Sequence, residues 1–318
     1  MKILANDGIS KTGEIHFENA GMQVDTTHVA QEQLESYINE NQIEVLIVRS
    51  ATEVRSHLID NCPSLKIVAR GGVGMDNIDV EYAREAGVEV INTPKASSHS
   101  VAELVFAHLL GIVRYLHDSN RSMPLEGDSN FKGLKKSYAK GRELRGKTMG
   151  IFGLGQIGQA TAKLALSLGM KVIAFDPFVD EIQLEIEFFD GQSVFFSINP
   201  MSKEEVLQEA DFISLHVPSQ ETYLIGKSEL ELMKNDAVLI NASRGDVVDE
   251  VALVEALSSN QIAFAGLDVF ENEPSPAIQL LMNPRVSLSP HIGAATKEAQ
   301  ERIGEELAEK IIQLSEIL

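Results

Sequence analysis

"GKTMGIFGLGQIGQATAKLALSLGMKVIAFDPF", residues 146–178, joins two short apolar runs through a glycine-rich turn and an alanine-rich, helix-like segment. Gly153, Gly155 and Gly158 form a G-x-G-x-x-G pattern, which is weak evidence when it stands alone. Here it directly follows the first apolar run, and the second run ends at Asp176. Dinucleotide-binding motifs carry an acidic residue about 20 residues beyond the glycines. The stretch therefore predicts a strand, a tight turn, a helix and a second strand that together bind a dinucleotide.

Each residue type in this pattern has a chemical reason. Gly153 permits the tight turn, and Gly158 lets the helix pack close to the strand. Gly155 has no Cβ that would block a pyrophosphate, and the N–H groups at the helix start attract phosphate. The Asp176 carboxylate can bind an adenosine ribose but would repel a 2′-phosphate, and no Arg follows it directly. We expect NAD rather than NADP; the alternative is a glycine turn in a flavodoxin-like sheet without a ligand.

Similar apolar runs recur along most of the chain, separated by helix-like segments. They are continuous rather than alternating, which indicates strands covered by helices on both faces, as in parallel sheets. The runs lie at residues 44–48, 66–69, 88–92, 148–152, 171–175, 211–217, 237–241 and 262–269. We predict an α/β fold with Rossmann-like or flavodoxin-like parallel sheets.

Two segments depart from this rhythm. Residues 97–118 carry apolar side chains at helical spacing and predict a long helix, and the polar residues 119–147 predict an extended arm into a second domain. In residues 184–198, polar and apolar side chains alternate on both sides of Asp190-Gly191, which predicts a β-hairpin. Residues 296–317, charged on one face, predict a closing helix.

Length and composition narrow the class of protein. A chain of 318 residues suggests two domains. The formal net charge of −20 argues against nucleic acid or an anionic membrane as a partner, since both need a basic face. The single cysteine, Cys62, excludes an intramolecular disulfide and is expected to be a small buried residue. No signal peptide or membrane span is evident, so we expect a cytoplasmic protein.

Candidate chemical groups follow the strands in the second half of the chain. Hydride transfer to a dinucleotide needs a group that moves a proton and a cation that holds a carboxylate or carbonyl. Arg244, Asp268 with Glu273, and His291 each follow an apolar run. Singly, Arg244 could cap a helix or pair with Asp246, Glu273 could be a solvated turn residue, and His291 could be a core residue.

Two other histidines are expected to be structural. His108 lies at helical spacing beside apolar residues, and His216 lies within a strand run. A carboxylate beside an imidazole stabilises the imidazolium and fixes its orientation, so Glu273 and His291 remain the stronger pair.

Five ordered motifs resemble one family. They are RGGVGMDNID (70–79), GLGQIG (153–158), NASRGDVVDE (241–250), LDVFENEP (267–274) and SPHIGAATKEAQ (289–300). Together they resemble the D-isomer-specific 2-hydroxyacid dehydrogenases, over about residue 40 to the C-terminus. The resemblance implies an NAD-binding domain, residues 96–289, inserted into a discontinuous substrate domain, residues 1–95 plus 290–318.

The resemblance also implies roles for individual residues. Arg244 would hold the substrate carboxylate and carbonyl, His291 would be the acid/base, and Glu273 would pair with His291. Further implied NAD contacts are Gln156, Ile157, Val217, Pro218, Ala242, Asp268, Gly293 and Ala294. Implied substrate contacts are Arg49, Ser50, Arg70, Val73 and Gly74. Lys135 and Lys136 are further candidates for a substrate phosphate, and no metal is expected.

Within the family, the chain is most similar to members that oxidise D-3-phosphoglycerate to 3-phosphohydroxypyruvate, the first step of serine biosynthesis. A phosphorylated substrate would explain Arg49 and Arg70, which could otherwise form salt bridges; such a local positive pocket would also offset the negative background charge. Alternatives are a reductase for hydroxypyruvate, glyoxylate or another 2-ketoacid, and an NADH-sensing, corepressor-like protein.

The resemblance further implies a homodimer or higher homo-oligomer through the helix at 97–118 and its arm; the apolar stripe of that helix, taken alone, could instead belong to the intramolecular core. The chain ends after the catalytic core, so we expect no regulatory domain and no feedback by serine.

Overall fold

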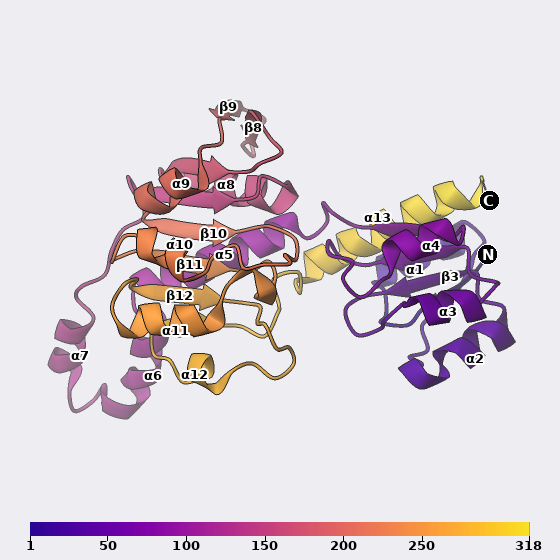
Figure 1. The fold of residues 1–318 in the computed structure, drawn as a ribbon, viewed down its shortest axis with the longest axis horizontal. Helices are drawn as coiled ribbons and strands as arrows, with labels where there is room; N and C mark the ends of the chain where they lie inside the picture. Colours follow the sequence, from indigo (N-terminus) through magenta and orange to yellow (C-terminus); the bar gives the residue numbers. More distant parts are fainter. Residues whose placement is uncertain (318) are drawn as a thin grey trace. The chain divides into compact units, whose positions relative to one another are not determined.

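The computed structural model describes residues 1–317 and divides into two compact units (Figure 1). The first unit is Met1–Ser100 with the segment that begins at Ala294, and the second is Val101–Gly293. The boundaries lie at 100/101 and 293/294, whereas the sequence predicts 95/96 and 289/290. The second unit is thus an insertion into a discontinuous first unit.

The first unit is a parallel sheet of five strands in the order β2-β1-β3-β4-β5. The strands are β1 (Lys2–Ala5), β2 (Gln23–Asp25), β3 (Val45–Val48), β4 (Ile67–Arg70) and β5 (Glu89–Asn92). One face is covered by α1 (Lys11–Asn19) and α13 (Lys297–Ser315), which bring Phe17 and Leu307 into the core. The other face is covered by α2 (Gln31–Asn41), α3 (Ser56–Asn61) and α4 (Val80–Glu85).

The second unit is a parallel sheet of six strands in the order β13-β12-β11-β10-β6-β7. The strands are β6 (Thr148–Phe152), β7 (Lys171–Phe175), β10 (Phe212–Leu215), β11 (Val238–Asn241), β12 (Phe264–Leu267) and β13 (Val286–Leu288). Continuous apolar runs fill these strands because both faces are covered, as the sequence predicts; β10 and β11 are buried at every position.

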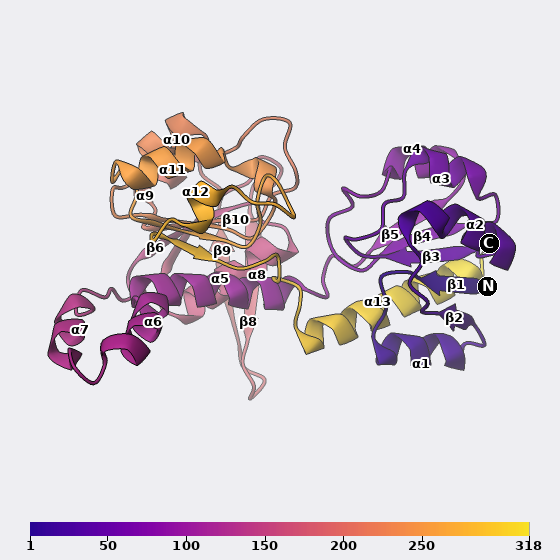
Figure 2. The same cartoon turned by 90° about the horizontal axis from the view of Figure 1, so that it is seen from below.

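Helices form the outer layers of the second unit. On one face lie α5 (Ser98–Val113) and α8 (Gln156–Ser167), and on the other lie α9 (Lys203–Glu209), α10 (Lys227–Leu232) and α11 (Glu250–Ser258) (Figure 2). The short elements η1 (Gly245–Val247) and α12 (Ile278–Leu281) follow β11 and β12. The loops after β6, β10, β11, β12 and β13 therefore leave the same edge of one parallel sheet, where ligands of open α/β sheets bind.

The prediction of an extended arm at residues 119–147 is wrong. The helix α5 ends at Val113, and Tyr115 adopts a left-handed conformation with φ 52°. Two more helices follow, α6 (Leu116–Glu126) and α7 (Phe131–Ser137). The sequence pattern did not predict these helices. Because α6 buries no residue and α7 buries only Leu134, neither helix has a buried apolar stripe.

The predicted hairpin is confirmed. It consists of β8 (Ile182–Glu187) and β9 (Ser193–Ile198), paired antiparallel, and Figure 1 shows it beyond α8 and α9. Leu184 and Ile198 at its base are buried in the core of the second unit, whereas Phe189 at its tip is fully exposed. Residues 1–317 contain no single helix long and apolar enough to cross a bilayer; α5 and α6 meet that test only as a pair bent by 55°.

Candidate active site

The glycine turn after β6 has the geometry that a dinucleotide needs. Gly153 has φ 89°, and a Cβ on it would collide with the backbone oxygen of His216 at the end of β10. A Cβ on Gly158 would collide with the backbone oxygen of Gly153. A Cβ on Gly155, in contrast, would meet no atom within 4 Å, so this glycine faces open space at the start of α8. Gly153 and Gly158 are thus required by the protein's own packing, and the space at Gly155 fits a pyrophosphate.

The start of α8 and the end of β7 complete this cradle. No side chain caps the N-terminus of α8, which leaves its first N–H groups for a phosphate. Asp176 accepts hydrogen bonds from the N–H of Leu154 at 2.7 Å and the N–H of Phe178 at 2.9 Å. The carboxylate is therefore held against the glycine turn, at the place where a ribose hydroxyl would bind. These residues fit NAD.

His291 and Glu273 form a direct pair. His291 Nδ1 lies 2.8 Å from Glu273 Oε2, and both side chains are partly exposed, 46% and 37% respectively. Glu273 Oε1 accepts a hydrogen bond from the N–H of Phe270 at 3.0 Å, which fixes the carboxylate. Because a carboxylate only accepts, Nδ1 carries the proton in this pair, and Nε2 is the ring nitrogen that can exchange a proton with a substrate.

The segment that carries His291 is anchored by Asp268. His291 has a left-handed backbone, φ 54°, and its N–H donates to the backbone oxygen of Asp268 at 2.8 Å. The buried Asp268 carboxylate accepts from the N–H groups of Ile292 and Gly293, each at 2.8 Å, and from Ser289 Oγ at 2.6 Å. The resemblance implies that Asp268 lies beside the nicotinamide. The observed contacts show in addition that Asp268 fixes the backbone of residues 291–293, which the sequence did not suggest.

Arg244 follows β11 in a turn fixed by Asn241. Asn241 is buried, donates to the Arg244 backbone oxygen at 2.8 Å, and accepts from the Ser243 N–H and hydroxyl. The Arg244 guanidinium donates to the Ser243 backbone oxygen at 2.7 Å. Asp246, the surface partner considered from the sequence, instead accepts from Ser219 Oγ.

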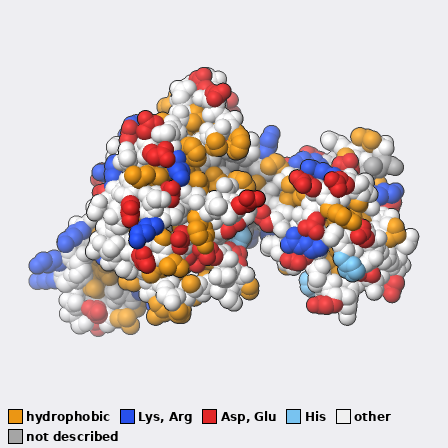
Figure 3. Space-filling view, in the orientation of Figure 1, with side chains coloured by type: hydrophobic (Ala, Val, Ile, Leu, Met, Phe, Trp, Pro, Cys, Tyr) orange, Lys and Arg blue, Asp and Glu red, His pale blue; other side chains and the backbone are white. Residues whose placement is uncertain are grey.

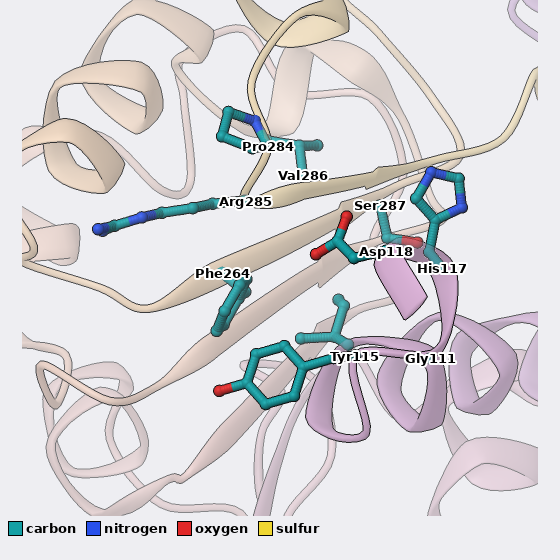
Figure 4. A pocket seen from close by; sticks show the side chains of 10 residues that line it. Gly111, Tyr115, His117, Asp118, Phe264, Pro284, Arg285, Val286 and Ser287 are labelled. Carbon is teal, nitrogen blue, oxygen red and sulfur yellow. The ribbon is translucent and has the colours of Figure 1, made fainter. Parts of the chain in front are cut away.

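A cavity of about 360 Å³ opens beside the His291–Glu273 pair. Its lining comes from the second unit: Phe270, Glu273, Pro274, Pro276, Leu281, Leu288, Ser289, Pro290 and His291. A separate hollow at the junction of α5 and α6, lined by Tyr115, His117 and Arg285, is drawn in Figure 4. Its volume of about 30 Å³ has room for little more than water, so it is not a substrate site.

Among the predicted substrate residues of the first unit, Arg49 and Ser50 follow β3, Arg70 ends β4, and Val73 and Gly74 follow β4. The Arg49 N–H donates to Asp7 Oδ2 at 2.6 Å, and the Arg49 backbone oxygen accepts from Asn77 at 2.8 Å. Asn77 also accepts from Arg70 Nε at 3.1 Å. Asn77 therefore ties the loops after the two strands together; sequence reasoning missed this role, although Asn77 lies within the motif 70–79.

The turn after Arg70 offers backbone donors. Asn92 donates to the Val73 backbone oxygen at 2.6 Å, which fixes the turn. Within residues 1–317, no protein acceptor faces the N–H groups of Val73 and Gly74, and both residues are partly exposed. Ser50, in the loop after β3, is exposed.

The remaining predicted residues lie at the following places. Gln156 and Ile157 open α8, Val217 and Pro218 follow β10, and Ala242 follows β11. Gly293 ends the second unit and Ala294 begins the last segment of the first unit. Lys135 and Lys136 are exposed on α7. Cys62 is buried, as expected.

Comparison with known proteins identifies the family. Residues 106–293 match the family described as "D-isomer specific 2-hydroxyacid dehydrogenase, NAD binding domain". The chain is 41% identical to a hydroxypyruvate reductase of Thermotoga maritima, with 98% of this chain and 97% of the relative covered. It is 39% identical to a D-3-phosphoglycerate dehydrogenase of Methanocaldococcus jannaschii, covering 98% of this chain but only 57% of that relative.

The fold agrees with the sequence match. A crystal structure of the protein TT0316 from Thermus thermophilus superposes with a TM-score of 0.84 at 30% identity, over 99% of this chain and 97% of that one. The range 106–293 that matches the family contains the glycine turn, Arg244, Glu273 and His291. The chain belongs to the D-isomer-specific 2-hydroxyacid dehydrogenases and carries the NAD-binding domain of that family.

Proposed function

We propose that this enzyme oxidises D-3-phosphoglycerate to 3-phosphohydroxypyruvate with NAD, and catalyses the reverse reduction. The observation that carries the chemistry is the 2.8 Å contact between His291 Nδ1 and Glu273. NAD, when bound, accepts a hydride from the substrate C2 carbon or returns one.

His291 moves the proton. In oxidation, its neutral Nε2 takes the proton of the C2 hydroxyl; in reduction, the imidazolium returns a proton to the C2 oxygen. Glu273 holds the ring through Nδ1 and stabilises the imidazolium. Arg244 supplies a fixed positive charge for the substrate carboxylate and for the charge that develops on the C2 oxygen.

Candidate groups for recognising the carboxylate and the far end of the substrate lie within the first unit. The N–H groups of Val73 and Gly74 suit a carboxylate, since two adjacent backbone donors can bind its two oxygens. Arg49 and Arg70 suit a phosphate, with Ser50 beside them. Lys135 and Lys136, exposed on α7 of the second unit, are separate candidates for a phosphate.

A second candidate is a reductase for hydroxypyruvate, glyoxylate or another 2-ketoacid. The observation that favours it is the Thermotoga maritima relative, named for hydroxypyruvate reduction, which the chain covers almost completely. Both candidates use the same acid/base pair and differ only in how the far end of the substrate is bound.

We further propose that the protein is a cytoplasmic homodimer.

The deciding experiment compares kcat/KM for NADH oxidation with 3-phosphohydroxypyruvate, hydroxypyruvate, glyoxylate and 2-oxoglutarate. The proposal expects the phosphorylated ketoacid to be preferred by about 100-fold or more, because a bound phosphate contributes several kcal/mol. A flat profile, or one led by hydroxypyruvate, would establish the second candidate. NADH binding without turnover of any of the four would instead favour the NADH-sensing, corepressor-like protein.

A further inference from the structure

His108 occupies a buried position on α5, where its two ring nitrogens contact two serines of the strand that leads to His291. Its Nδ1 lies 2.8 Å from Ser287 Oγ, and its Nε2 lies 2.8 Å from Ser289 Oγ. The residue is 6% exposed, and burial, opposed in part by the nearby Asp268, lowers its pKa. A helix of the outer layer is thus hydrogen-bonded to the end of β13.

The chemistry of the neighbours fixes the direction of these hydrogen bonds. Ser289 has one hydroxyl proton, and it lies 2.6 Å from Asp268 Oδ1, which can only accept. Ser289 Oγ must therefore accept from His108, so neutral His108 carries its proton on Nε2. Its Nδ1 then accepts from the Ser287 hydroxyl.

Beyond Asp268 the chain of contacts ends at the catalytic segment. The carboxylate binds the N–H groups of Ile292 and Gly293, while the Asp268 backbone oxygen binds the N–H of His291 itself. Three consecutive N–H groups are held by one residue, and that residue's side chain is oriented by Ser289 and, through it, by His108. A partly buried network of this kind favours one geometry because each alternative leaves a polar atom of the buried His108 or Asp268 unpaired.

We propose that His108 is a positioning residue: through Ser289 and Asp268 it sets the backbone of residues 291–293 and thereby the direction of the His291 ring. The inference rests on the proposed role of His291 as the acid/base. A purely structural His108 would change stability only, whereas a positioning residue changes kcat at unchanged cofactor affinity, since a small misplacement of a catalytic group slows the chemical step.

The test compares His108→Gln with His108→Met. The two side chains have similar length and volume, but only Gln can donate to Ser289. We expect His108→Met to lower kcat about 10-fold with the NADH Kd within about 2-fold of wild type, and His108→Gln to recover most of the loss. Equal kcat values for the two variants, after correction for the folded fraction by thermal unfolding, would overturn the proposal.

Substitutions of Ser287 and Ser289, the two hydrogen-bond partners of His108, test the same proposal independently. Ser289→Ala breaks the connection to Asp268 and should reproduce the His108→Met phenotype, whereas Ser287→Ala removes only the outer hydrogen bond and should have a smaller effect. The reverse order would contradict the proposed route. Wild-type turnover, measured first on the same ketoacids, separates the two hypotheses: an inactive wild type refutes the proposed function, while an active wild type with unaffected variants refutes only the role of His108.

Discussion

His291 has an unusual left-handed backbone conformation and an imidazole side chain that pairs with Glu273. A non-glycine residue at φ 54° is uncommon, and the conformation persists here because Asp268 binds the N–H groups of residues 291–293. The backbone turn directs the ring to Glu273, and that pairing leaves Nε2 for the substrate. The geometry of His291 therefore depends on Asp268 and Glu273, which hold its backbone and its ring.

Replacing His291 with Asn should abolish most of the activity while leaving the fold intact. Asn tolerates a left-handed backbone, as Asn260 does in this chain at φ 60°, so the change removes the acid/base group without new backbone strain. We expect kcat to fall by about 10²- to 10⁴-fold, the usual contribution of general acid–base catalysis. Stopped-flow turnover and NADH titration check this; turnover near the wild-type level would remove His291 from the mechanism.

Two glycines of the turn, Gly158 and Gly155, predict different phenotypes. Gly158→Ala should destabilise the second unit, because its Cβ would collide with the backbone oxygen of Gly153, which cannot move cheaply. Gly155→Val should leave thermal stability near wild type, because its Cβ faces open space, but should weaken NADH binding by about 10-fold or more through exclusion of the pyrophosphate. Thermal unfolding and NADH titration of both variants decide; tight NADH binding by Gly155→Val would show that the cofactor lies elsewhere.

Asp211 connects β10, β6 and the end of α10 at the amino ends of the strands in the second unit. The residue precedes β10, accepts from the N–H of Thr148 at the start of β6 at 2.8 Å, and pairs with Lys234 after α10 at 3.0 Å. Burial, the largest single influence, would raise the pKa of Asp211, but the hydrogen bonds and the Lys234 charge together lower it. The ionised carboxylate therefore stabilises the folded state.

Asp211→Asn should lower the free energy of unfolding by about 1–3 kcal/mol at neutral pH, the usual cost of disrupting a hydrogen-bonded charged group. Because the folded pKa lies below the unfolded value of about 3.9, the difference from wild type should stay constant above that pH. It should then shrink as the pH falls through the folded pKa. Urea unfolding of both proteins across the acid range tests this, and a difference that is unchanged in acid would exclude the carboxylate as its source.

The predictability of elements follows from how they are buried. Strands β3, β10 and β11 were predictable because every position is buried, and a continuous apolar run has few other interpretations. The edge strand β2, three residues with no buried position, and the helices α6 and α7 carry no such pattern. Their conformation depends on neighbours distant in sequence.

The candidate site divides in the same way. The positions of Arg244, Glu273 and His291 after strands could be predicted because each lies in a recognisable motif; their catalytic roles stay predictions. The contacts of Asp268 with residues 289–293, and of Asn77 with Arg49 and Arg70, could not, because they connect separate loops. Motifs therefore predict where the candidate chemical groups lie, while the fold determines what holds them in place.

The net charge of the chain affects how strongly it attracts or repels a charged substrate. Asp and Glu side chains are spread over the face shown in Figure 3 rather than gathered in one patch, and the net charge is −20. An acidic body repels an anionic substrate at long range, so the proposed binding residues Arg49, Arg70 and Arg244 would have to overcome that field. The same charge also opposes association of two copies, so a dimer needs an apolar contact strong enough to offset it.

The helices α6 and α7 offer such a contact. Leu116, Leu125 and Phe131 are 63%, 80% and 57% exposed, which is costly in water unless a second copy covers them. We expect twice the mass of one chain in sedimentation velocity experiments at micromolar concentration. The double variant Leu125→Glu with Phe131→Glu should shift that mass to a monomer, because a carboxylate buried in an apolar interface is strongly unfavourable.

The hairpin supplies the matched control. Phe189 is more exposed than Leu125 and Phe131 but lies at the tip of β8–β9, so Phe189→Glu should leave the dimer mass unchanged. If Phe189→Glu dissociates the dimer and the α6–α7 variant does not, the copies associate through the hairpin instead. A wild type that stays monomeric at tens of micromolar would mean that the exposed side chains of α6 and α7 stay in water, and the homodimer proposal would be abandoned.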